Sequence, residues 1–182
     1  MALFRDKKIQ RVLLIYGILV IAFHLFFLKL GKGDDSYYQA CLMESSFFEI
    51  LWERWNEWSS RGIIEAVLLL VVQQGPWVWM ALDILASMLI AALAVWFLFY
   101  REREVPAAPV VLLLVLLLSY DFRELSSAGW MTTTVNYWWS LAALLLAFFP
   151  LTLGEVRGRV WAYVFSVPAA VFAVNHEQIC LL

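Results

Sequence analysis

Residues 77–100 read WVWMALDILASMLIAALAVWFLFY, and Asp83 is the only charged residue in this run. At 1.5 Å per helical residue the run is about 36 Å long, which exceeds the roughly 30 Å hydrocarbon core of a bilayer. It ends in Arg-Glu-Arg-Glu at residues 101–104. The stretch therefore predicts a transmembrane helix that stops at a charged membrane surface.

A second long apolar run lies upstream. Residues 12–30 read VLLIYGILVIAFHLFFLKL and follow a basic segment, residues 1–11. The run resembles a signal peptide only superficially, because its apolar part is too long and no small-residue cleavage site follows it. We expect a retained transmembrane helix over 12–30 with a cytoplasmic N-terminus.

Three shorter apolar runs complete the pattern, at 106–120, 137–153 and 160–174. At about 15 to 17 residues, they either extend into neighbouring polar sequence or cross a locally thinned bilayer. The fold class predicted is all-α: a single polytopic membrane helix bundle of about five transmembrane helices. Its outer loops are expected at 31–76 and 121–136.

The composition agrees with a membrane protein. The 182 residues are 64% hydrophobic and 15% charged, whereas soluble domains are about 45–50% apolar and about 25% charged. The ten Trp and seven Tyr suit the headgroup level of a bilayer. A net charge of −2 without a basic block excludes nucleic acid as an expected partner and leaves membrane lipid.

The charges orient the bundle. Five crossings from a cytoplasmic N-terminus place segments 1–11, 101–105 and 154–159 inside, and they hold most of the 13 basic residues, in agreement with the positive-inside rule. Most acids fall outside. The inner basic residues are Arg5, Lys7, Lys8, Arg11, Arg101, Arg103, Arg157 and Arg159.

The first outer loop predicts helices that lie along the membrane interface. Glu49, Glu53 and Glu57 recur opposite an aromatic face, which is typical of an amphipathic helix. The apolar run 63–72 is too short to cross and predicts an interfacial or re-entrant helix. The aromatic face comprises Phe48, Leu51, Trp52, Trp55 and Trp58.

Four polar motifs, far apart in sequence, fall on the outer side in this topology. We therefore expect them to converge at one water–lipid boundary. The motifs are Gly33-Asp34-Asp35, Trp58-Ser59-Ser60-Arg61, the segment from Gly129-Trp130 to Asn136-Tyr137-Trp138-Trp139, and Asn175-His176-Glu177-Gln178.

Each motif has a functional and a structural interpretation. Asp34 and Asp35 either deprotonate an acceptor hydroxyl or hold a divalent cation, or they cap the following helix, where Ser36 and Gln39 fit a capping box. Arg61 either pairs with a phosphate group or snorkels at the interface.

The remaining polar residues carry the same ambiguity. His176 and Glu177 offer acid–base or metal-ligand chemistry, although an adjacent pair is weak evidence for a metal. Asn136 is either a helix N-cap beside an aromatic belt or part of a sugar-binding platform. Within the spans, His24 and Asp83 are either functional or paired within the bundle.

Cysteine usage adds little. Cys41 and Cys180 show no metal-ligand spacing. Both fall on the outer side, where they either form a disulfide or stay as free thiols.

In order and spacing, the four motifs resemble those of the GT-C superfamily of membrane glycosyltransferases. Within it, the chain is most similar to bacterial inner-membrane proteins of the O-antigen-glucosylating or uncharacterised type. The resemblance implies transfer of a sugar from a polyprenyl-phosphate carrier to a cell-surface glycan acceptor at the outer face.

The resemblance also implies residue roles. Asp34 or Asp35 would be the general base, and Arg61 would contact the carrier phosphate. The sugar or acceptor site would be shaped by Trp130, Asn136, Tyr137, His176 and Glu177. Some members use a divalent metal, for which Asp34 and Asp35 are the candidate ligands, and others do not.

Two observations qualify this reading. Members of the superfamily carry about twice as many spans, so the chain is expected to be their N-terminal half and inactive alone. Other membrane functions also fit the composition: a transporter or flippase subunit would use Asp83 and His24, and an assembly protein would need no single outer residue.

Overall fold

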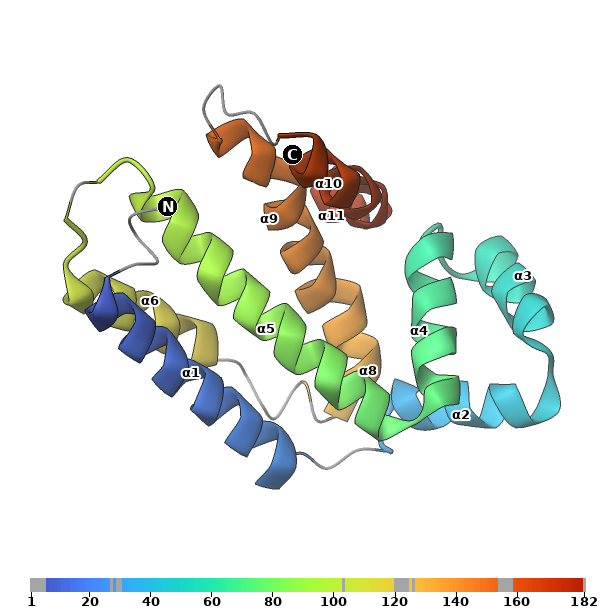
Figure 1. Ribbon diagram of the computed structural model, residues 1–182. Helices are drawn as coiled ribbons and strands as arrows, with labels where there is room; N and C mark the ends of the chain where they lie inside the picture. The colour runs from blue at the N-terminus through green and yellow to red at the C-terminus, as the bar shows by residue number, and fades with distance from the viewer. Residues whose placement is uncertain are drawn as a thin grey trace.

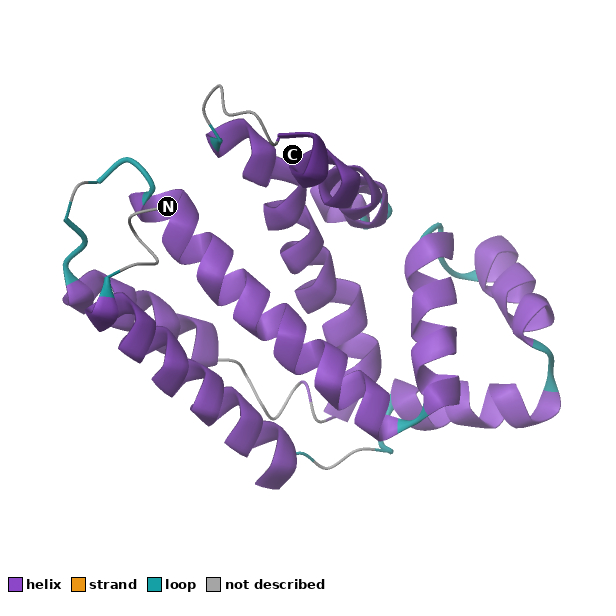
Figure 2. Cartoon of the chain, viewed as in Figure 1, coloured by secondary structure: helices purple, strands orange, loops and turns teal. Residues whose placement is uncertain are grey.

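The computed structural model describes residues 6–26, 28, 31–102, 104–119, 125, 127–153 and 159–181, and all regular secondary structure in these ranges is helical (Figure 2). The all-α prediction is confirmed. The elements are α1 (Lys7–Phe26), α2 (Asp34–Glu44), α3 (Phe47–Glu57), α4 (Gly62–Gln74), α5 (Pro76–Phe99), α6 (Ala107–Leu118), α8 (Trp130–Thr133), the π-helical turn η2 (Thr134–Trp138), α9 (Trp139–Thr152), α10 (Arg159–Val174) and α11 (Glu177–Cys180).

Three helical stretches are long and apolar enough to cross a membrane. They are α1, α5 and the continuous stretch Trp130–Thr152 formed by α8, η2 and α9. In contrast, α6 has 12 residues and α10 has 16, which gives lengths of about 18 and 24 Å. The described residues therefore indicate an integral membrane protein with three candidate spans, fewer than the five that the apolar runs predict.

Two helix boundaries differ from those expected. The first helix begins at Lys7, inside the expected tail, because the Asp6 carboxylate accepts the backbone N–H of Lys8 at 2.7 Å. Residues 130–136 are helical although they lie within the expected loop 121–136. The first span thus begins earlier than its apolar run, and the third candidate span begins well before residue 137.

The candidate spans pack through an apolar core. Figure 1 shows α1 and α5 lying side by side, and α9 contacts both α5 and α10. A buried cluster joins α1, α5 and α6. It comprises Ile9, Tyr16, Val20, Ala91, Val95, Trp96, Val110 and Leu114.

Helices α2, α3 and α4 form a separate group beside the N-terminal end of α5 (Figure 1). A capping box between Ser46 and Glu49 begins α3, and Gly75, at a φ of 88°, makes the corner before α5. Helices over 48–58 and 63–72 were expected, and α3 and α4 confirm them. The core that α2, α3 and α4 share also includes residues of α5, α8 and η2, so the group is fixed to the end of the bundle where α5 and α8 begin.

A buried charged network holds this group together. The Arg54 guanidinium lies 3.6 Å from the Glu65 carboxylate, which also accepts a hydrogen bond from the Tyr38 hydroxyl. The same guanidinium lies over the rings of Tyr38 and Trp58 at 5.3 and 5.4 Å. The network fastens α3 to α2 and α4, just ahead of the loop that carries Arg61.

Candidate functional site

The first and third polar motifs meet at the start of α8. The Asp35 carboxylate accepts the backbone N–H groups of Met131 (3.2 Å) and Thr132 (2.9 Å) and the Thr132 hydroxyl (3.0 Å). Asp35 is therefore an N-cap supplied from 96 residues upstream in the chain, where a negative charge also favours the helix dipole.

Two glycines allow this close approach. Gly33 and Gly129 both have positive φ angles, of 55° and 110°. A Cβ atom on Gly129 would lie 2.8 Å from Asp35 Oδ1, and one on Gly33 would lie 2.3 Å from the carbonyl oxygen of Ser127. The glycines of both motifs thus serve the contact between α2 and α8.

The two acids of the first motif have different environments. Asp35 is fully buried, and burial raises the pKa of its carboxyl, an effect that the hydrogen bonds from Thr132 and Met131 partly offset. Asp34 is exposed at the first turn of α2. Asp35 therefore has the geometry of a structural cap, whereas the Asp34 carboxylate is open to its surroundings.

No side chain caps the N-terminus of α2, although Asp34, Asp35 and Ser36 were considered for this role. Its N-cap is Gly33, with no side-chain cap hydrogen bond, and the Ser36 hydroxyl instead donates to the carbonyl oxygen of Gly31 at 2.7 Å. The sequence pattern at Ser36 and Gln39 thus does not form a capping box.

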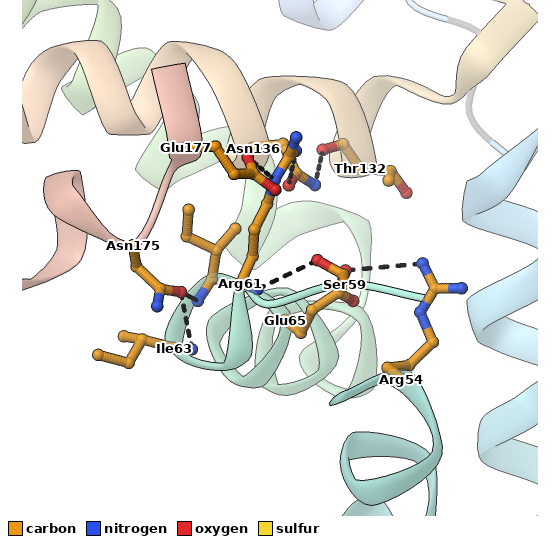
Figure 3. Close-up of polar contacts among 10 residues, drawn as sticks. Arg54, Ser59, Arg61, Ile63, Glu65, Thr132, Asn136, Asn175 and Glu177 are labelled. Atoms are coloured by element: carbon orange, nitrogen blue, oxygen red, sulfur yellow. Dashed lines mark hydrogen bonds and ion pairs between the residues drawn. The ribbon is translucent and has the colours of Figure 1, made fainter. Parts of the chain in front are cut away.

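The second, third and fourth motifs meet at Arg61 (Figure 3). Its Nε donates to Glu177 Oε2 at 2.6 Å, and Nη1 donates to Asn136 Oδ1 at 3.1 Å. Its guanidinium also lies 5.7 Å from the centre of the Tyr137 ring. Arg61, Asn136, Tyr137, His176 and Glu177 are called the Arg61 cluster below.

Local contacts fix the two sides of the cluster. The Ser59 hydroxyl accepts the backbone N–H of Arg61 at 3.1 Å, which shapes the turn between α3 and α4. Asn175 Oδ1 accepts the backbone N–H groups of Ile63 (3.0 Å) and Ile64 (3.1 Å), so it caps α4 from the end of α10 (Figure 3). This cap could not be predicted from the sequence, because Asn175 and its partners lie more than 100 residues apart.

His176 is buried inside the Arg61 cluster. Its ring packs edge-on against Tyr137 at 5.1 Å, and among the described residues neither of its buried ring nitrogens has a hydrogen-bond partner. Burial and the nearby Arg61 charge lower the pKa of His176, so the ring is neutral at pH 7. An unpaired buried polar group in a native fold calls for a ligand or an ordered water.

A cavity of about 530 Å³ adjoins the cluster. Its walls come from α1, α5, α6, α8 and η2 and are mostly apolar, although His24 and Asp83 also line it. Tyr137 lines this cavity and also lies under Arg61, while Trp130 lines it and packs edge-on against Phe23 at 5.7 Å. Tyr137 is therefore the residue that connects the Arg61 cluster to the cavity between the candidate spans.

The structure offers little for a metal. Within the described residues, no group of three or more His, Cys, Asp or Glu side chains lies together as a metal site. The Asp35 carboxylate already accepts three hydrogen bonds, and a divalent cation on Asp34 and Asp35 stays a prediction. Cys41 and Cys180 are free thiols.

Comparisons with known proteins identify no relative. No protein-family model matches the chain, and neither the curated proteins nor the solved structures contain a match.

Proposed function

We propose that the chain is a membrane glycosyltransferase, or part of one, that takes a sugar from a polyprenyl-phosphate carrier and transfers it to a cell-surface glycan. The observation that carries the proposal is the Arg61 guanidinium over the ring of Tyr137, a residue that also lines an apolar cavity. A guanidinium pairs strongly with phosphate, and the cavity suits a hydrocarbon chain.

The remaining residues take roles that their contacts support. Asn136 and Tyr137 hold Arg61 in position, and the unpaired His176 nitrogens offer a hydrogen bond to a sugar hydroxyl. Asp34, exposed beside the cap formed by Asp35, is the general base that the GT-C resemblance implies. Glu177 neutralises Arg61 and is the group that an incoming phosphate displaces.

We further propose the expected topology for this function. The N-terminus is cytoplasmic, α6 and α10 complete five crossings of a bacterial inner membrane, and the Arg61 cluster faces outward. The shorter α6 and α10 cross where the bilayer thins around them.

Complementation of a deletion strain tests the transferase proposal, with surface glycans profiled by mass spectrometry. The proposal predicts that the wild-type gene restores one sugar and that Asp34→Asn and Arg61→Ala do not. Arg101→Ala is the matched control, because Arg101 also lies over a tyrosine ring, Tyr100, at 5.3 Å. If both outer-side variants restore the glycan fully, the chain has a non-catalytic assembly role.

Transport is the second candidate function, because His24 and Asp83 form an ionisable pair that lines the same cavity. A transporter that uses the charge of this pair would lose substrate uptake in vesicles with Asp83→Asn and keep it with Asp34→Asn. The transferase proposal predicts the opposite pattern for glycan synthesis.

A further inference from the structure

Three indole groups attach the π-helical turn η2 to α5. Trp79 Nε1 donates to Thr134 Oγ1 at 2.9 Å, and Trp138 Nε1 donates to Ser87 Oγ at 2.9 Å. Trp139, directly after the turn, donates from Nε1 to Asp83 Oδ1 at 2.7 Å. The turn that contains Asn136 and Tyr137 is therefore attached to α5 at both of its ends.

The acceptor for Trp139 belongs to a larger network. Asp83 Oδ2 lies 2.9 Å from His24 Nε2, and His24 Nδ1 lies 2.8 Å from the carbonyl oxygen of Val20. A carbonyl oxygen only accepts, so Nδ1 carries a proton. Both oxygens of Asp83 are thus engaged, and the network joins α1, α5 and α9, one helix from each candidate span.

The π turn decides which way its side chains face. Each residue of an α-helix turns the direction of its side chain by about 100°, so the extra residue of a π turn changes the facing of everything beyond it. With this turn, Asn136 reaches Arg61 while Trp138 and Trp139 reach α5. A regular α-helix here would lose one set of contacts or the other.

We propose that Asp83, supported by His24, is a positioning residue: through Trp139 it holds the π turn and so keeps Asn136 and Tyr137 against Arg61. The consequence for ligand binding rests on the proposed function, but the positioning is a property of the free protein. Asp83 and His24 thereby act on the Arg61 cluster without touching a substrate, and the charge of Asp83 is dispensable for this role.

The variant Asp83→Asn distinguishes the proposed positioning role of Asp83 from a role of its charge. The Oδ1 of an introduced amide still accepts from Trp139, and its Nδ2 donates to a neutral His24 ring. Alanine supplies neither contact. Asp83→Asn therefore keeps the network and Asp83→Ala removes it.

Fluorine NMR of protein labelled with 3-fluorotyrosine in lipid nanodiscs tests the proposal. The Tyr137 resonance is assigned by its loss in Tyr137→Phe. We expect Asp83→Ala and Trp139→Phe to shift it and Asp83→Asn to leave it nearly unchanged. Thr152→Ala is the matched control, because it removes an equivalent indole hydrogen bond, from Trp96 at 2.7 Å, between the same helices near their other end.

The outcomes separate the two proposals. A Tyr137 resonance unmoved by Trp139→Phe, or moved as strongly by Thr152→Ala, overturns the positioning role. This holds even if Asp83→Ala fails to fold, since Trp139→Phe keeps the contact between His24 and Asp83.

With polyprenyl phosphate as the probe, we expect Asp83→Ala to weaken binding about tenfold and Asp83→Asn to bind as the wild type does. If the resonance behaves as expected but wild-type protein does not bind, only the proposed function fails.

Discussion

At the scale of single residues, neighbours in sequence divide into separate roles. Asp34 is exposed, while Asp35 is buried and caps a helix from elsewhere in the chain. Asn175 caps α4, whereas the adjacent His176 keeps both ring nitrogens unpaired among the described residues. In these two motifs, one polar residue caps a helix and its neighbour does not.

The role of Asp35 predicts a difference in stability between the two acids. Asp35→Ala leaves two backbone N–H groups and a buried hydroxyl without their acceptor, which costs about 3 kcal/mol. Asp34→Ala, at an exposed position, changes the stability by less than about 0.5 kcal/mol. Thermal unfolding in detergent measures both, and equal losses would contradict the cap.

The lowered pKa of His176 predicts a dependence on pH. The unfolded ring binds a proton near pH 6.5, and the folded ring binds it only at lower pH. The folded state is therefore most stable, with respect to this group, above about pH 6.5, and its free energy of unfolding decreases as the pH falls below that value. The protection factors of the α11 amides, which correct for the slower intrinsic exchange at lower pH, should decrease on acidification from pH 7 to 5.

A variant isolates the effect of this ring. His176→Gln should remove most of the pH dependence in that range, because the chain has only one other histidine, His24. An unchanged pH profile in His176→Gln would assign the effect elsewhere.

At the scale of elements, the sequence predicted the helices better than their ends. Apolar runs located α1, α5 and α9, because each is a local property of the chain. The start of α8 was expected to be loop, because its cap is Asp35 and rules for helix starts look for a cap nearby in sequence. The π turn could not be predicted for the same reason, because the indole hydrogen bonds that hold it join η2 to α5, which is distant in sequence. Trp79 of α5 donates to Thr134, and Trp138 of η2 donates to Ser87.

The glycine contact between α2 and α8 predicts unequal costs for two alanine substitutions. Gly129→Ala and Gly75→Ala both strain a backbone at positive φ, by about 1–2 kcal/mol. Only at Gly129 does the added Cβ also meet a neighbour, Asp35 Oδ1 at 2.8 Å, while at Gly75 nothing lies within 4 Å. Melting temperatures should therefore fall further for Gly129→Ala, and equal falls would argue against tight packing there.

At the scale of the whole molecule, the sequence predicted that four distant motifs would converge, and the described residues bring them together in two groups. Asp35 meets Thr132, and Arg61 meets Asn136 and Glu177. Composition and the topology of apolar runs were enough for this proximity. They could not predict which residues form hydrogen bonds with one another, because these partners depend on the π turn and on how α2–α4 pack against α5 and η2.

The proposed orientation predicts which residues a membrane-impermeant thiol reagent reaches. In a background with Cys41 and Cys180 replaced by serine, a cysteine introduced at Ser36 should react from outside intact cells. One introduced at Glu102, beyond the other end of α5, should react only after the cells are permeabilised. The reverse pattern would put the Arg61 cluster on the cytoplasmic side.

The most direct test of the central claim is the binding of polyprenyl phosphate to the protein in neutral lipid nanodiscs, followed by the phosphorus NMR signal of the lipid. We expect wild type and Arg101→Ala to shift this signal equally, and Arg61→Ala to weaken binding by about tenfold or more, as the loss of a charge-assisted hydrogen bond requires. The uncharged polyprenol should compete poorly. Equal binding by wild type and Arg61→Ala would contradict the claim that the Arg61 cluster receives a lipid-linked phosphate.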